Sequence, residues 1–137
     1  MAGPSEGGAS LELKRVVKRY RETVAVDGVS LSINPGEFLT LLGPSGSGKT
    51  TVLNLIAGFV RATEGEIWMD EVPITKVAPY RRNIGMVFQH YALFPHMTAA
   101  ENVAYPLKQR KVGRVDVRRR VAGALELVEL GEYKEQD

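Results

Sequence analysis

One short stretch of the chain has the residue types and the spacing of a loop that holds a polyphosphate. It reads Gly43-Pro44-Ser45-Gly46-Ser47-Gly48-Lys49-Thr50 and matches the pattern G-x-x-x-x-G-K-[ST] at every position. Glycines allow consecutive backbone N–H groups to turn inward around phosphate oxygens. In such a loop the lysine reaches the β- and γ-phosphates, and the threonine hydroxyl binds Mg²⁺. The pattern therefore predicts a nucleoside triphosphate site.

The sequence on either side predicts the elements that position this loop. Residues 38–42 (Phe-Leu-Thr-Leu-Leu) are a short apolar run typical of a buried parallel strand. After the loop, apolar residues recur at helical spacing, at Val52, Leu55, Ile56 and Phe59. This spacing predicts a helix with one face on a sheet and its N-terminus at the phosphates.

Further strands are expected at residues 11–20, 24–33, 66–69 and 84–88, with a firm turn at 34–36. Thr98 and Glu101 have the spacing of a capping box that opens a helix. Asp116 is expected to cap the last helix at its N-terminus, and Gly131 to end it. That helix should bury one stripe, formed by Val117, Val121, Ala124, Leu125 and Val128.

Composition excludes several classes of protein. The 137 residues are 44% hydrophobic and 25% charged, as in an ordinary soluble protein, and include no cysteine for disulfides or thiolate chemistry. No apolar run approaches the ~20 residues of a membrane span. Residues 1–10 are rich in Gly, Ser and Ala, and we expect a disordered leader rather than a secretory signal. The remaining residues, 11–137, are expected to form one domain of cytoplasmic character.

A phosphate-binding loop alone leaves many families open, but other residues narrow the choice. Residues 37–51 resemble the strand and loop of the ATP-binding subunits of ABC transporters, and Tyr20 lies 23 residues ahead of Gly43, where that family places an aromatic ring. Residues 81–89 and 91–98 resemble the family's Q-loop region, in wording most like importers of the spermidine/putrescine and ferric-iron type. The resemblance covers nearly the whole chain, from about Leu11 to Gly131. It implies an α/β fold, a RecA-like P-loop NTPase core with an antiparallel β subdomain, incomplete at its C-terminal side.

The resemblance also implies roles for single residues. Tyr20 would stack on adenine, with stacking worth about 1–3 kcal/mol by analogy with base–aromatic contacts. Gln89 would bind Mg²⁺ beside Thr50, or orient the attacking water. Thr51 would lie near the α-phosphate and complete the cradle with Ser45 and Ser47. ATP and Mg²⁺ are therefore the expected cofactors.

The implied partners are transmembrane permease subunits and a second ATP-binding subunit. The apolar segment that follows Gln89, as far as Thr98, would receive the permease. This places the protein on the cytoplasmic face of the membrane, with a polyamine as a candidate transported solute and no nucleic acid as a ligand.

Parts that the family needs for hydrolysis do not occur in the 137 residues. There is no Leu-Ser-Gly-Gly-Gln signature, no apolar strand ending in Asp-Glu after the Q-loop, and no switch histidine. We therefore expect a truncated subunit that binds ATP and hydrolyses it poorly, and assign no catalytic residue beyond Gln89. Asp70 and Glu71 follow a short apolar run, but at a position where the family has an antiparallel strand and a turn.

Three alternatives remain open at the level of sequence. A small self-sufficient P-loop kinase would need Asp70 and Glu71 for catalysis, and Arg118–Arg120 in a lid. A nucleic-acid-binding protein would use a basic patch in residues 14–21. A regulatory module would bind nucleotide without turnover.

Overall fold

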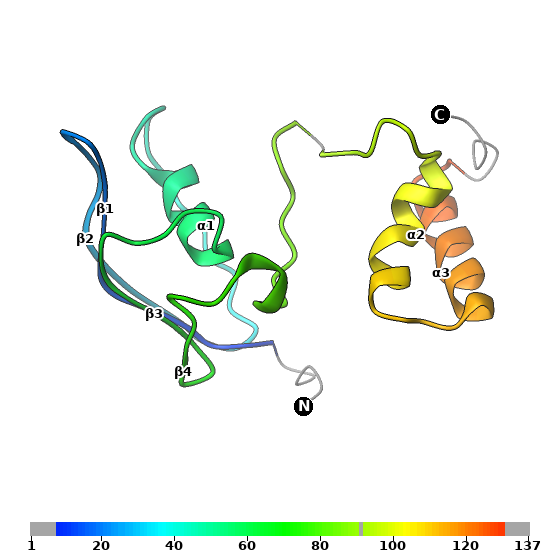
Figure 1. Cartoon of the computed structure of the whole chain (residues 1–137), viewed down its shortest axis with the longest axis horizontal. Helices are drawn as coiled ribbons and strands as arrows, with labels where there is room; N and C mark the ends of the chain where they lie inside the picture. The colour runs from blue at the N-terminus through cyan, green and yellow to red at the C-terminus, as the bar shows by residue number, and fades with distance from the viewer. Residues whose placement is uncertain (1–7, 91, 131–137) are drawn as a thin grey trace. The chain divides into compact units, whose positions relative to one another are not determined.

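The computed structural model describes residues 8–90 and 92–130 (Figure 1). They divide into two compact units, Met1–Met86 and Val87–Asp137, and each is described by itself. Three sequence predictions lie outside the described residues: most of the leader, Tyr91 in the apolar segment, and Gly131 as a helix end.

The first unit is built on an antiparallel sheet. Its strands are β1 (Leu11–Tyr20), β2 (Thr23–Ile33), β3 (Glu64–Met69) and β4 (Val72–Pro73), in the order β2-β1-β3-β4. Leu13 in β1 pairs with Leu31 on one side and with Ile67 on the other. The strands predicted at 11–20, 24–33 and 66–69 are thus confirmed. The turn at 34–36 is also confirmed, because the Glu37 backbone N–H donates to the Asn34 carbonyl at 3.1 Å.

Helix α1 (Lys49–Ala57) covers one face of this sheet (Figure 1). The core joins side chains of β1, β2, β3, α1 and the segment after β4, at Leu13, Val16, Val26, Val52, Leu55, Ile67 and Ile74. Val52 and Leu55 bury the helix face that the apolar spacing predicted. This packing fixes the helix that begins inside the phosphate-binding loop.

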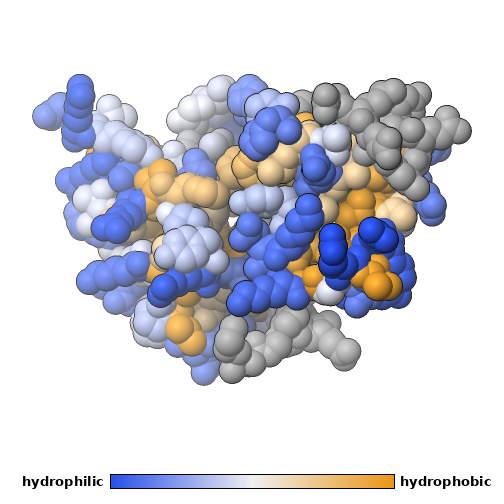
Figure 2. All heavy atoms as spheres, turned by 45° about the vertical axis from the view of Figure 1, so that its right-hand side comes forward, coloured by the Kyte–Doolittle hydropathy of each residue, from blue (hydrophilic) through white to orange (hydrophobic). Residues whose placement is uncertain are grey.

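Two predicted strands, the parallel strand at 38–42 and the strand at 84–88, are wrong for the described residues. Residues 38–42 and 84–88 form no strand there, and Phe38 and Leu42 are 91% and 90% exposed. Only Leu41 of the first segment packs against the core. A parallel strand needs paired neighbours and cover on both faces, whereas this sheet is antiparallel and its apolar face is already covered by α1. Figure 2 shows hydrophobic side chains on the face of the molecule that it draws.

Helix α1 ends at Ala57, two residues earlier than the apolar spacing suggests. Gly58 is its C-cap, with φ 87°, and its N–H donates to the carbonyls of Asn54 and Leu55. Phe59 therefore lies beyond the helix and is 52% exposed, so its assignment to the buried helix face is wrong. A one-turn 3₁₀ helix, η1 (Pro79–Arg81), closes the unit after β4.

The second unit is a helical pair, α2 (Ala99–Gln109) and α3 (Arg114–Leu127). The Thr98–Glu101 capping box is confirmed in both directions. Ala104, Val121 and Leu125 form the buried contact between the helices.

The predicted start and stripe of α3 need correction. Its N-cap is Gly113, so Asp116 lies in the first turn. There its carboxylate forms an ion pair with Arg119, with Oδ1 and Nη2 2.7 Å apart. Of the predicted stripe, Val117 packs against the buried pair, but Ala124 is exposed and Val128 is 59% exposed. Among the residues that the structure describes, α2 is the cover for this face, and only the centre of the stripe is buried there.

Candidate nucleotide-binding site

Lys49 lies folded over the loop that the sequence pattern marked. Its ammonium donates to the carbonyl oxygens of Gly43 and Pro44, both at 2.7 Å, and to Ser47 Oγ at 3.1 Å. The loop also closes on itself through the Ser47 N–H and the Pro44 carbonyl, 3.3 Å apart. A cation is thus held among loop atoms, where a polyphosphate would need it.

Two glycines keep the loop compact, and Gly48 is required where it stands. Gly48 has φ 87°, and a Cβ there would collide with the carbonyl oxygen of Ala25 in β2. A Cβ on Gly43 would come within 2.7 Å of Ser47 Oγ. The loop is therefore pressed against β2 on one side and against its own serine on the other.

Helix α1 begins directly at the loop. Gly48 is its N-cap, without a side-chain cap, and Val52 N–H donates to the Gly48 carbonyl at 2.9 Å. The first N–H groups of a helix have no partner within the helix and attract anions. Thr50 is exposed and Thr51 is half-buried in this first turn. The donor set, one ammonium with free helix N–H groups and hydroxyls, fits a triphosphate with Mg²⁺.

Tyr20 ends β1 in the same unit as the loop. Its side chain is 46% exposed, and the Lys18 ammonium lies 4.7 Å from the ring centroid. The same ammonium donates to the Arg61 carbonyl at 3.0 Å. One face of the ring is thus covered by a cation, and the exposed remainder is available for stacking.

Gln89 belongs to the second unit, so its pairing with Thr50 stays a prediction. It is exposed in a turn with His90. The segment after it is anchored by Asn102 of α2, whose side-chain amide contacts main-chain atoms of Phe94, Met97 and Thr98 at 2.9 to 3.2 Å. Phe94 also packs on Tyr105, with ring centroids 4.6 Å apart. Residues 94–98 of the predicted partner-binding segment are therefore held against the start of α2.

Asp70 and Glu71 have a structural place. They form the tight turn between β3 and β4, with φ 47° and 64°. Asp70 Oδ1 accepts from the Ser10 N–H at 2.8 Å and from Ser10 Oγ at 3.3 Å. This agrees with the antiparallel strand and turn that the resemblance implied.

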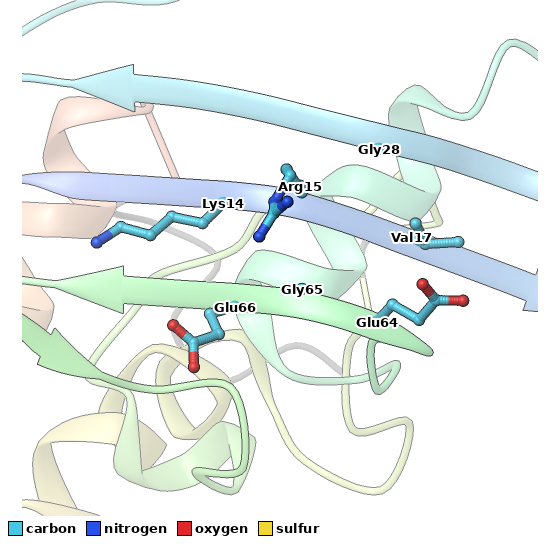
Figure 3. A pocket seen from close by; sticks show the side chains of 7 residues that line it. All are labelled: Lys14, Arg15, Val17, Gly28, Glu64, Gly65 and Glu66. Atoms are coloured by element: carbon cyan, nitrogen blue, oxygen red, sulfur yellow. The ribbon is translucent and has the colours of Figure 1, made fainter.

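The sheet also bears a groove of about 640 Å³ between β1 and β3 (Figure 3). Three of its charged side chains have partners: Lys14 pairs with Glu12 at 3.1 Å, Glu64 with Arg19 at 3.5 Å, and Glu66 accepts from Trp68 Nε1 at 3.0 Å. These contacts also engage Lys14 and Arg19 of the basic patch considered for nucleic acid. We assign no ligand to this groove.

Known proteins resemble this chain in sequence and in fold. A family model described as ABC transporter matches residues 26–137. The chain belongs to the ABC transporter family.

Relatives in this family share its sequence closely. A spermidine/putrescine import ATP-binding protein PotA of Nitrosomonas eutropha is 53% identical over 125 residues, which cover 91% of this chain and 34% of the relative. An Fe(3+) ions import ATP-binding protein FbpC of Fusobacterium nucleatum is 43% identical over 127 residues, covering 93% and 34%. The chain thus spans about a third of the length of these curated relatives.

A solved member of the family has a similar fold. The structure titled as a dimeric post-hydrolysis state of the ATP-binding cassette MJ0796 bound to ADP and Pi matches with a TM-score of 0.81 at 35% identity. The match covers 90% of this chain and 60% of the other. The α/β P-loop fold with an antiparallel sheet is therefore confirmed at the level of the ABC cassette.

Two side chains with several hydrogen bonds each, Arg82 and Asn102, are not predicted from the sequence. Arg82 is buried and binds four carbonyls, and Asn102 holds the start of α2. Arg82 was visible only as one arginine of a matched segment, because its partners are main-chain atoms distant in sequence. Asn102 lies next to the capping-box glutamate, and that proximity was the one available signal.

Proposed function

We propose that the chain is the N-terminal part of an ATP-binding subunit of an ABC importer, with MgATP held by the loop at residues 43–50. The observation that carries this proposal is the Lys49 ammonium fixed on a glycine-rich loop at the start of α1. The names of the relatives support the importer class.

The residues that would hold the nucleotide divide by chemistry. Lys49 and the N–H groups at the start of α1 would bind the phosphates, and Thr50 and Gln89 would hold Mg²⁺. Tyr20 would stack on the base with the face that Lys18 does not cover. When bound, Mg²⁺ would neutralise phosphate charge and fix its geometry.

The partners are proposed on the same basis. The segment from Gln89 to Thr98 would contact transmembrane permease subunits, supported by Leu93, which is 69% exposed. A second ATP-binding subunit would complete the assembly. The solved relative MJ0796 is described as a dimer, which supports this proposal. No helix in the described residues is long and apolar enough to cross a membrane. We propose attachment to the cytoplasmic face through the permease, and a polyamine as the solute, as in the names of several relatives.

The test is ATP binding measured beside ATP turnover on the 137-residue chain. Lys49→Ala should abolish binding, whereas Lys76→Ala, an exposed lysine of the same unit, should leave it unchanged. Turnover in the wild type should be no higher than in Lys49→Ala. Lys49-dependent turnover on the order of 10 s⁻¹, an ordinary enzyme rate, would contradict the proposal and favour a self-sufficient P-loop enzyme.

A further inference from the structure

Arg82 is a buried cation in the first unit, with a side chain only 4% exposed. Its guanidinium makes four hydrogen bonds, all to main-chain carbonyls: Nη1 donates to Leu55 at 2.8 Å and to Ile56 at 2.7 Å, Nε to Val77 at 2.9 Å, and Nη2 to Thr75 at 3.2 Å. In the described ranges, 8–90 and 92–130, no carboxylate forms an ion pair with it. The charge is held by peptide dipoles alone.

Two of these carbonyls belong to the last turn of α1. The final four carbonyls of a helix have no partner within it and carry the negative end of its dipole. Gly58 N–H satisfies the carbonyl of Asn54 and shares that of Leu55, and Arg82 binds those of Leu55 and Ile56. Burial lowers the pKa of Arg82 through desolvation, but a guanidinium remains charged at neutral pH.

Gly58 keeps the space that Arg82 occupies. A Cβ at this position would lie 2.5 Å from Arg82 Nε and 2.8 Å from Cζ. A side chain at residue 58 would therefore displace the guanidinium even with residue 82 unchanged. The glycine cap and the arginine together satisfy free carbonyls at the carboxyl end of α1.

The opposite end of the same helix carries the phosphate-binding residues. Helix α1 has nine residues from Lys49 to Ala57, so its two ends are about 14 Å apart. Its apolar face rests on the sheet through Val52 and Leu55. This packing holds the helix on the sheet, and the directional hydrogen bonds from Arg82 add a restraint on its position along its axis.

We propose that Arg82 is a positioning residue for the phosphate-binding loop, holding α1 at the depth and angle at which Lys49 and Thr50 meet the phosphates. The inference rests on the proposed binding of ATP by this loop. Lysine would be a poor substitute, because it has three donors at one point and the site presents four acceptors around a planar fork.

The test compares nucleotide affinity with the fraction of chain that binds. Arg82→Met, Arg82→Lys and Gly58→Ala are titrated with ATP and with inorganic tripolyphosphate, while thermal unfolding is recorded in parallel. Arg81→Met is the matched control for the arginine, since Arg81 is the exposed neighbour in sequence. Gly28→Ala is the control for glycine strain, because Gly28 also has a positive φ, 59°, with nothing within 4 Å of its Cβ.

The expected result is a Kd for both ligands raised about tenfold to a hundredfold in Arg82→Met and Gly58→Ala, as for the loss of one charge-assisted contact to phosphate. Arg82→Lys should give a smaller rise, and the two controls should keep the wild-type Kd. An equal effect on tripolyphosphate assigns the loss to the phosphate loop rather than to the base.

A role in stability alone gives a different pattern. The fraction of binding-competent chain and the melting temperature would then fall, while the remaining folded chain kept the wild-type Kd. Wild-type Kd values in both Arg82→Lys and Gly58→Ala overturn the inference, even where Arg82→Met does not fold. Failure of the wild-type chain to bind either ligand would overturn the proposed function as well, so the two failures are distinguishable.

Discussion

Side chains at the loop divide their work by donor type. Lys49 supplies a cation that is already bound to three loop oxygens. When a nucleotide binds, its phosphate oxygens would replace these neutral acceptors, and the ammonium would not need to move far. Thr50 and Thr51 supply neighbouring hydroxyls, of which only the first has the position of a Mg²⁺ ligand in the loop pattern. The pair therefore offers an internal comparison of metal and phosphate contacts.

Thr50→Val should weaken ATP binding only when Mg²⁺ is present. Loss of one metal contact should raise the Kd about tenfold to a hundredfold in Mg²⁺, from the ~1.5–3 kcal/mol of a charge-assisted contact, and leave it unchanged in EDTA. Thr51→Val is the matched variant and should lose affinity equally in both buffers. Calorimetric titration in the two buffers checks this. An equal loss for Thr50→Val with and without metal would contradict its role.

Asp70→Asn should leave nucleotide turnover unchanged and lower stability slightly. The carboxylate of exposed Asp70 accepts two hydrogen bonds from Ser10, so its loss should cost less than about 1 kcal/mol of unfolding free energy. Urea unfolding and an ATPase assay check the two statements. Any fall in a Lys49-dependent turnover would restore the catalytic reading of Asp70.

At the scale of elements, local signals predicted well and long-range ones did not. Strands β1, β2 and β3, the turn at 34–36 and the Thr98–Glu101 capping box are set by alternation or by contacts within a few residues, and all were predicted. The strands expected at residues 38–42 and 84–88 rest on apolar content and on position beside the family motifs, not on any visible strand partner. A buried parallel strand depends on neighbours elsewhere in the chain, which a local pattern does not contain.

The candidate site shows the same division. The loop residues were predicted from their spacing, because the motif encodes its own conformation. Arg82 was missed as a structural contact, because its value comes from carbonyls at residues 55, 56, 75 and 77. The start of α3 was misplaced by three residues, because Gly113 has no side chain to mark it as a cap.

Asn102→Ala should destabilise the helical unit more than Gln109→Ala, an exposed control on the same helix. The amide of Asn102 holds the segment from Phe94 to Thr98 onto the start of α2. Losing these contacts should cost about 1–3 kcal/mol. Hydrogen exchange of the amides in residues 94–104 measures the effect. Equal protection in the two variants would show that Asn102 does not hold this segment.

At the scale of the whole molecule, the chain combines small cores with large apolar side chains at the surface. Phe38, Leu42 and Val87 are 91%, 90% and 96% exposed, while Leu13, Val16 and Leu55 are nearly fully buried. Exposed apolar side chains that gather into one patch are typical of surfaces that bind other protein. The relatives that the chain matches are about three times as long as the matched segment.

Phe38→Ser with Leu42→Ser should reduce the binding of a hydrophobic dye such as ANS without unfolding the first unit. Both side chains are in solvent, so each change should stay within about 0.5 kcal/mol. Leu55→Ala, fully buried, is the opposite case and should cost about 2–5 kcal/mol. Dye fluorescence and urea unfolding check this. A loss from the double variant as large as from Leu55→Ala would show that residues 38–42 are buried in solution.

The loop at residues 43–50 is proposed to hold the triphosphate of MgATP. A ¹⁵N–¹H correlation spectrum titrated with MgATP tests it most directly, because it reports which backbone amides respond. We predict saturable shifts concentrated at Gly46, Gly48 and the first turn of α1, and their loss in Lys49→Ala. Shifts confined to the groove at Lys14 and Gly65, or shifts that survive Lys49→Ala, would contradict it.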